Sequence, residues 1–285
     1  MKKKAAELDA LLFVDTNVLL DFYRIRKSDI STDYLTQLEN ITDRLILGSQ
    51  VEMEYKKNRQ TVILEANSNF SAPDFSKLTA PAMLSDLQAV KMIQKKKQEI
   101  IAQKNVVSEK IKKILSDPTH HDPVYQCFQR IFKSSGPYNL MRPMPERFAI
   151  RSLARKRFVL GYPPRKKTDN SIGDAVNWEW IIKCAQTSGK HVIIVSRDTD
   201  YGVTFDGQSY LNDFLRQEFS QRVSKQRKIL LTEKLSTALK TIHAAVTAEM
   251  EEEESRIIAE SLSDFEDLTA DHQLKMAFSP ARTST

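Results

Sequence analysis

The chain has 285 residues, with 43 Lys and Arg against 37 Asp and Glu, and its hydrophobic content of 41% is that of an ordinary globular protein. The two cysteines exclude a disulfide scaffold and a cysteine-ligated zinc cluster, and no apolar run approaches the ~18 residues that cross a bilayer. We therefore expect a cytoplasmic protein of one large or two small domains, with no secretion signal and no membrane partner.

The net charge of +6 hides an uneven distribution along the chain. Residues 91–167 carry 19 Lys and Arg against 5 Asp and Glu, a local charge of +14, whereas residues 249–267 hold nine acids and one Arg. A segment as basic as 91–167 is typical of a protein that binds a polyanion such as nucleic acid. A solvated, lysine-rich helix face gives the same count, so charge alone does not identify the partner.

Strands and helices alternate at the start of the chain. The apolar runs 11–14 and 44–48 predict strands, the first buried on both faces. Helices are expected over 18–23, 28–40 and 49–67. This order indicates a parallel sheet with crossover helices.

Residues 68–170 have a different composition. A loop over 68–81 is followed by one long, lysine-rich helix over 82–116, and two shorter helices are expected near 124–133 and 146–158. We interpret the whole of 68–170 as a basic helical insertion.

The alternation then resumes. We expect helices over 174–187, 209–219 and 233–254, and strands over 191–195 and 228–231. The predicted fold is α/β, with a central parallel sheet of about four to five strands flanked by helices. In this division 1–67 and 171–255 form one domain, and 256–285 is a polar tail that we expect to be disordered.

Two aspartates stand where predicted strands end. Asp15 directly follows the first strand, and Asp198 lies three residues beyond Val195. Ligands of open parallel sheets bind outside the carboxyl ends of the strands, so both carboxylates should face the same crevice. A strand-end Asp also caps a following helix or turn, so neither residue is conclusive alone.

The string Phe13-Val14-Asp15-Thr16-Asn17-Val18-Leu19-Leu20 resembles the opening motif of PIN-domain ribonucleases, a three-layer fold shared by many bacterial toxin nucleases. The resemblance covers about 11–67 and 171–201. It implies an acid in the first motif, one on a following helix, one at the start of a late helix and one after the next strand. The matching catalytic and metal-binding residues are Asp15, Glu54, Asp174 and Asp198, with Asp169 and Asp200 as secondary metal ligands and Asn17 and Ser196 as polar groups that orient them.

Two of these positions have close alternatives. Residues two apart on a helix face about 200° from each other, so only one of Glu52 and Glu54 can face the site. The Ser49-x-x-Glu52 spacing of a capping box gives Glu52 a local role, which favours Glu54. Asp169 remains open as the alternative to Asp174.

Carboxylates that converge as bare anions raise one another's pKa values, and a hard cation removes this conflict. An all-oxygen donor set suits Mg²⁺ or Mn²⁺, as one ion or two. The resemblance then implies metal-dependent hydrolysis of RNA, with single-stranded DNA as an open alternative substrate. Whether the chain acts as a toxin or in antiviral defence, and whether it binds an inhibitor protein or a second copy of itself, is left open by the sequence.

The basic segment would hold the phosphate backbone near the acids. The cations that we expect to contact it are Arg155, Lys156, Arg157, Arg165, Lys166 and Lys167.

Three rival functions share parts of this pattern. A non-catalytic RNA-binding protein could keep the same fold, and a DNA-cleaving nuclease is related in fold. Haloacid dehalogenase phosphatases also place an Asp after their first strand, but they need a second Asp two residues on, where this chain has Asn17.

Overall fold

The computed structural model of the chain describes residues 8–68, 70, 75, 78–165 and 171–261. Its centre is a parallel sheet of five strands in the order β3-β2-β1-β4-β7. In chain order these are β1 (Ala10–Val14), β2 (Leu45–Gly48), β3 (Asn139–Leu140), β4 (His191–Val195) and β7 (Ile229–Thr232). The predicted α/β fold with a parallel sheet of four to five strands is confirmed.

The two central strands are the most apolar ones. Every residue of β1 is buried, and in β4 only His191 is partly exposed. They pair in parallel, and the register sets Val14 opposite Val195. The residues that follow these two strands therefore emerge side by side at one edge of the sheet.

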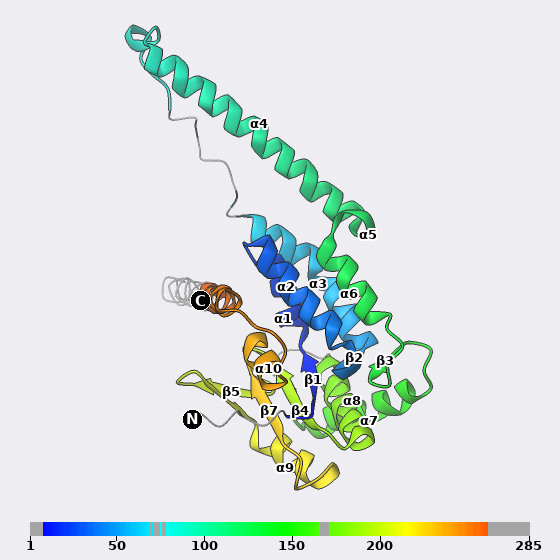
Figure 1. Cartoon of the computed structure of the whole chain (residues 1–285). Helices are drawn as coiled ribbons and strands as arrows, with labels where there is room; N and C mark the ends of the chain where they lie inside the picture. The colour runs from blue at the N-terminus through cyan, green and yellow to red at the C-terminus, as the bar shows by residue number, and fades with distance from the viewer. Residues whose placement is uncertain (1–7, 69, 71–74, 76–77, 166–170, 262–285) are drawn as a thin grey trace, which may run out of the picture.

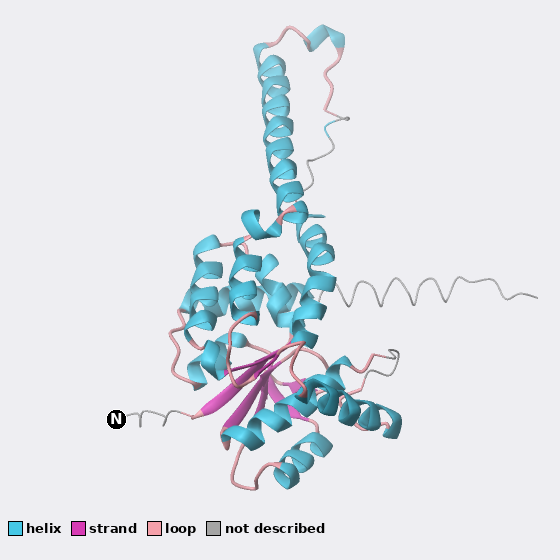
Figure 2. Cartoon of the chain, turned by 90° about the vertical axis from the view of Figure 1, so that its right-hand side faces the viewer, coloured by secondary structure: helices cyan, strands magenta, loops and turns pink. Residues whose placement is uncertain are grey.

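Helices cover both sides of the strands (Figures 1 and 2). One group holds α1 (Thr16–Leu20), α2 (Ser28–Asn40), α3 (Ser49–Ser68) and α6 (Pro123–Phe132), with short 3₁₀ turns at Asp21–Tyr23 and Thr42–Arg44. The other group holds α7 (Glu146–Leu160), α8 (Gly173–Ser188) and α9 (Asp213–Arg222). None of the helices in the described ranges is both long and apolar enough to cross a membrane.

The basic range 68–170 is not uniform in structure. A 3₁₀ turn at Ala82–Leu84 precedes α4 (Gln88–Ser116), which projects away from the body and has no buried residue (Figure 1). After the short α5 (Pro118–His121), α6 packs into the core, β3 pairs with β2 and α7 packs on α8. The proposed boundaries of the insertion stay a prediction, and the part that stands apart from the sheet is α4.

The second half of the chain differs from the predicted elements at two places. The helix expected from 209 begins at Asp213, where the Asn212 side chain caps it, and β5 (Gly202–Phe205) and β6 (Gln208–Leu211) form a hairpin before it. The helix expected over 233–254 is split into α10 (Leu235–Thr241) and a last helix over 248–261, because the backbone at His243 turns to a positive φ of 59°.

The predicted tail begins inside this last helix. Residues 256–261 are helical, and Ile257 is buried. The rest of the predicted tail, 262–285, lies outside the described residues.

Candidate metal centre

The carboxyl ends of β1 and β4 bring Asp15 and Ser196 together. The Asp15 amide donates to the Val195 carbonyl over 2.9 Å, and Ser196 Oγ donates to Asp15 Oδ2 over 2.5 Å. Asp15 Oδ1 also accepts from the Thr16 amide over 2.7 Å, so Asp15 caps α1, and Asn17 Nδ2 lies 3.3 Å from Oδ2. Capping and site geometry therefore fix the same carboxylate.

Helix α3 carries Glu54 to this strand end. Glu54 Oε2 accepts from Thr16 Oγ1 over 3.2 Å, and its Oε1 accepts from Gln50 Nε2 over 2.7 Å. Its alternative, Glu52, pairs instead with Lys56 along the helix surface, with 2.7 Å between Oε1 and Nζ. Of the two, the structure brings Glu54 to Asp15.

Helix α8 begins close to the polar side chains of α3, so that a side chain at Gly173 would displace them. A Cβ on Gly173 would lie 2.3 Å from Glu54 Oε1 and 2.8 Å from Gln50 Nε2. Asp174 follows in the first turn of α8. The close approach therefore sets Asp174 beside Glu54.

Three aspartates complete the cluster. Asp174, Asp198 and Asp200 each offer a carboxylate oxygen, and these three atoms lie within 4.8 Å of one another, a spacing that can hold one metal ion. The Ser196 hydroxyl accepts from the Asp198 amide over 3.0 Å, which ties the turn after β4 to Asp15. Asp169, the predicted alternative to Asp174, lies outside the described residues.

Burial and neighbouring charge act on Asp15 together. Burial raises the pKa of Asp15 to about 6, the hydrogen bonds from Ser196 and the Thr16 amide act to lower this pKa, and the charges of Asp198 and Glu54 raise it. Among the residues that the structure describes, the donors that bond Asp15 and Glu54 are neutral groups. The cluster thus concentrates negative charge without neutralising it at these two positions.

A buried tyrosine hydroxyl faces the same acids. Tyr201 is fully buried, its ring lies 6.2 Å from that of Phe13, and its pKa is raised by burial and by the charges of the four acids Asp174, Asp15, Glu54 and Asp198. Within the described residues, Tyr201 Oη and Asn17 Oδ1 are buried and have no hydrogen-bond partner.

These features fit a hard divalent cation. The donor set consists of carboxylate and neutral oxygens, which Mg²⁺ and Mn²⁺ prefer. A bound ion and its water would also give hydrogen-bond partners to Asn17 Oδ1 and Tyr201 Oη.

The predicted nucleic-acid contacts have different environments. Arg155 and Lys156 are exposed on α7, and Arg165 is exposed with its guanidinium 4.6 Å from the centre of the Phe158 ring. Lys166 and Lys167 lie outside the described residues.

The prediction that Arg157 contacts the nucleic-acid backbone is wrong. Arg157 is buried, its Nε donates to Glu179 Oε1 over 2.9 Å, and its Nη2 pairs with Glu218. A guanidinium held by two carboxylates inside the protein cannot reach a phosphate outside.

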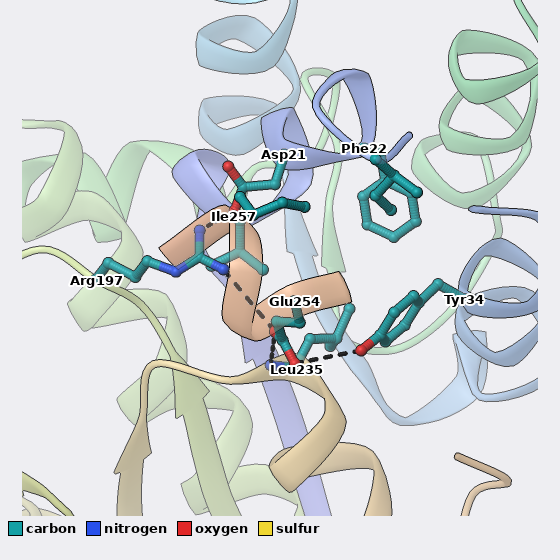
Figure 3. A pocket seen from close by; sticks show the side chains of 9 residues that line it. Asp21, Phe22, Tyr34, Arg197, Leu235, Glu254 and Ile257 are labelled. Atoms are coloured by element: carbon teal, nitrogen blue, oxygen red, sulfur yellow. Dashed lines mark hydrogen bonds and ion pairs between the residues drawn. The ribbon is translucent and has the colours of Figure 1, made fainter. Parts of the chain in front are cut away.

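Arg197 lies between Ser196 and Asp198 in the sequence, but in the part of the chain that the structure describes its ion pairs are with Asp21 and Glu254 and not with the metal-site acids. Figure 3 shows its guanidinium directed at Asp21, with which it forms an ion pair, and at Glu254 of the last helix, at 3.9 Å. Glu254 also accepts from the Leu235 amide at the start of α10. Part of the acidic run 249–267 is therefore buried and anchors the last helix.

Sequence reasoning missed Thr16, Gln50 and Tyr201 as parts of the site. Gln50 stands four residues before Glu54, a spacing that puts both on one helix face, so it could have been found. Nothing local marks Tyr201, because its place beside the acids follows from the turn after β4.

Comparison with known families gives one match. A family model described as the PIN domain matches residues 12–201, which is more than half of the chain. No curated protein and no solved structure matches the chain.

Proposed function

Because the chain belongs to the PIN-domain family, whose members are generally nucleases, we propose that it is a metal-dependent endoribonuclease. The observation that carries the proposal is the convergence of Asp174, Asp198 and Asp200 within 4.8 Å, beside the buried carboxylate of Asp15. The acids proposed to hold Mg²⁺ or Mn²⁺ are Asp15, Glu54, Asp174 and Asp198, with Asp200 in support.

The neutral groups around the acids have a positioning role. Ser196 and the Thr16 amide hold the two oxygens of Asp15, and Gln50 and Thr16 hold those of Glu54. A bound divalent cation would supply Lewis acidity to the scissile phosphate and a more acidic water. The protein's own groups hold the carboxylates in position before the substrate arrives.

RNA is the proposed substrate, and exposed cations would bring its backbone to the acids. Arg155, Lys156 and Arg165 are exposed in the basic range next to α8 in the chain. Their contacts would be sequence-independent, so binding should weaken steeply with salt.

The deciding experiment measures cleavage of labelled RNA and of single-stranded DNA with Mg²⁺ or Mn²⁺. We expect the wild type to cut RNA and Asp15→Asn to lose at least about 100-fold in rate. Changing a residue that only orients a metal ligand costs up to about 100-fold, and loss of the ligand itself should cost no less. Asp33→Asn, an exposed Asp on α2, is the matched control and should cut like the wild type.

Two outcomes count against the proposal. If Asp15→Asn cuts RNA as well as the wild type, the carboxylates do not do the chemistry. If the wild type cuts DNA and leaves RNA intact, the substrate is wrong while the metal centre stands.

A further inference from the structure

A small hollow opens at the same edge of the sheet as the acids. Its floor includes Gly48 and Leu140, the last residues of β2 and β3. The sheet order β3-β2-β1-β4 puts these strand ends next to those of β1 and β4. Adjacent strands lie about 4.8 Å apart, so the hollow and the carboxylates lie at neighbouring strand ends.

Polar and cationic side chains line the hollow. Arg147 and Arg151 enter from α7, Asn177 from α8, and Ser49 and Gln50 from the first turn of α3. The N-terminus of a helix as long as α3 presents amide donors and a partial positive charge.

Asn177 is the clearest sign of a missing ligand. Its side chain is 4% exposed and lines the hollow, and in the described part of the chain its Nδ2 is buried and has no hydrogen-bond partner. A buried amide donor left unpaired costs free energy, so it calls for an acceptor. The neighbouring Trp180 cannot supply one, because its indole N–H is itself a donor and bonds to the Leu47 carbonyl at 2.8 Å.

The arginines favour an anionic acceptor. Arg147 and Arg151 both line the hollow, and burial and the nearby charges of Arg151 and Arg142 lower the pKa of Arg147. Within the described residues, neither Arg147 nor Arg151 forms an ion pair with a carboxylate. An anion between them would relieve the repulsion.

Two side-chain pairs connect the hollow to the acids. Gln50 lines the hollow and donates to Glu54 Oε1 over 2.7 Å, one turn further along α3. Asn177 lies three residues after Asp174, on the same face of α8. The hollow is thus one helical turn from the carboxylates along both helices.

We propose that this hollow is a phosphate subsite, in which Arg147, Arg151 and Asn177 bind a backbone phosphate of the substrate close to the one that is cut. This proposal rests on the proposed nuclease function, because the subsite would hold the substrate's phosphate backbone in place across the metal-site acids. Arg147, Arg151 and Asn177 are positioning residues.

The test measures binding rather than cleavage. The affinity for a short, fluorescein-labelled single-stranded RNA is measured by fluorescence anisotropy with Mg²⁺. Every variant also carries Asp15→Asn, so that the RNA stays intact during the measurement. Arg151→Ala should weaken binding by about tenfold, as loss of a charged hydrogen bond does. Arg151→Lys should recover only part of it, because an ammonium lacks the bidentate fork.

Arg227→Ala is the matched control, because this exposed arginine precedes β7 at the amino ends of the strands, outside the hollow and outside the proposed nucleic-acid contacts. As an exposed charge it should cost less than about threefold in affinity. Equal losses for Arg151→Ala and Arg227→Ala would overturn the subsite, because they would show general electrostatic attraction alone. Melting curves of both variants check that each is folded.

Substituted RNAs distinguish an internal phosphate from a terminal or free one. A neutral methylphosphonate at the internal linkage that occupies the hollow should abolish the difference in RNA affinity between the Asp15→Asn protein and the same protein with Arg151→Ala. A difference that appears only with a 5′-phosphorylated RNA, or only as competition by inorganic phosphate, would overturn the internal subsite. If the wild type cuts nothing but these binding differences hold, the nuclease function fails and the phosphate subsite stands.

Discussion

Two clusters of acids, one around the buried Asp15 and one around the buried Glu179, differ in how their charge is balanced. Glu179 meets the guanidinium groups of Arg157 and Arg222, which also bind Glu218. Burial acts to raise the pKa of Glu179, but the hydrogen bonds from Arg222 and Arg157 outweigh it and the pKa is lowered. At Asp15, burial dominates and the pKa rises to about 6.

The difference separates a cluster that balances its own charge from the one that we propose to bind metal. The Glu179 cluster contains its own cations, so it is complete when the chain folds. Within the described part of the chain, Asp15 and Glu54 are bonded by neutral donors, and a bound cation would stabilise their charge. Perturbed acids of the second kind are typical of functional sites.

The largest change in stability should follow from removing one cation of the Glu179 cluster. Arg157→Ala leaves Glu179 buried with one cation fewer, and removal of one partner of a buried ion pair costs about 3–5 kcal/mol of unfolding free energy. Chemical denaturation measures it. Arg155→Ala, exposed on the same helix, should stay within about 0.5 kcal/mol of the wild type. A fully stable Arg157→Ala protein would mean that Arg157 is not a structural residue.

At the Asp15 cluster we expect a substitution to increase the stability of the fold. In EDTA, Asp15→Asn should raise the unfolding free energy at pH 7 by up to about 3 kcal/mol, because a folded-state pKa near 6 penalises the ionised form. Asn keeps the cap on α1. Denaturation of both proteins in EDTA measures the gain.

The same substitution should change the pH dependence. A carboxyl whose folded pKa is raised stabilises the fold fully below its ordinary pKa of about 4, and this contribution is lost as the pH rises to about 6. The advantage of Asp15→Asn should therefore grow between pH 4 and 6 and then stay constant. An advantage that is the same at pH 4 and at pH 7 would contradict the raised pKa.

Added metal should act on one cluster and not on the other. Mg²⁺ or Mn²⁺ at about 100 times its dissociation constant should stabilise the wild type by about 2.7 kcal/mol. Asp15→Asn should gain less, whereas Arg157→Ala should gain as much as the wild type. Thermal melting in MgCl₂ and in NaCl of equal ionic strength measures both increments. Equal increments for wild type and Asp15→Asn would place the ion elsewhere.

Much of the fold followed from the sequence because parallel strands buried on both faces are continuous apolar runs, as in β1 and β4. The strand β3 escaped prediction because it has two residues in a proline-punctuated segment, and only its pairing with β2 defines it. The predicted acids follow the order that the resemblance implies: Asp15 and Asp198 come after strands, and Glu54 and Asp174 lie near the starts of helices.

Neighbourhood across the chain could not be predicted in the same way. Arg155 and Arg157 look alike in sequence, and only the packing of α7 on α8 sends one to solvent and the other to Glu179. The hollow behind Gln50 likewise joins three helices and two strand ends, a contact set that no local pattern contains.

The smallest effect should come from Tyr201, and it sharpens the comparison within the Asp15 cluster. Without metal, its buried hydroxyl has no partner among the described residues, so Tyr201→Phe should stabilise the protein by about 1 kcal/mol. With metal, the hydroxyl of the wild type can donate to the ion's water or to a carboxylate, so the increment from Mg²⁺ should be smaller in Tyr201→Phe. Tyr210→Phe, at a half-exposed ring, is the control and should change neither value. Identical Mg²⁺ increments in Tyr201→Phe and the wild type would show that the hydroxyl serves packing alone, and the need for a ligand would then rest on the carboxylates.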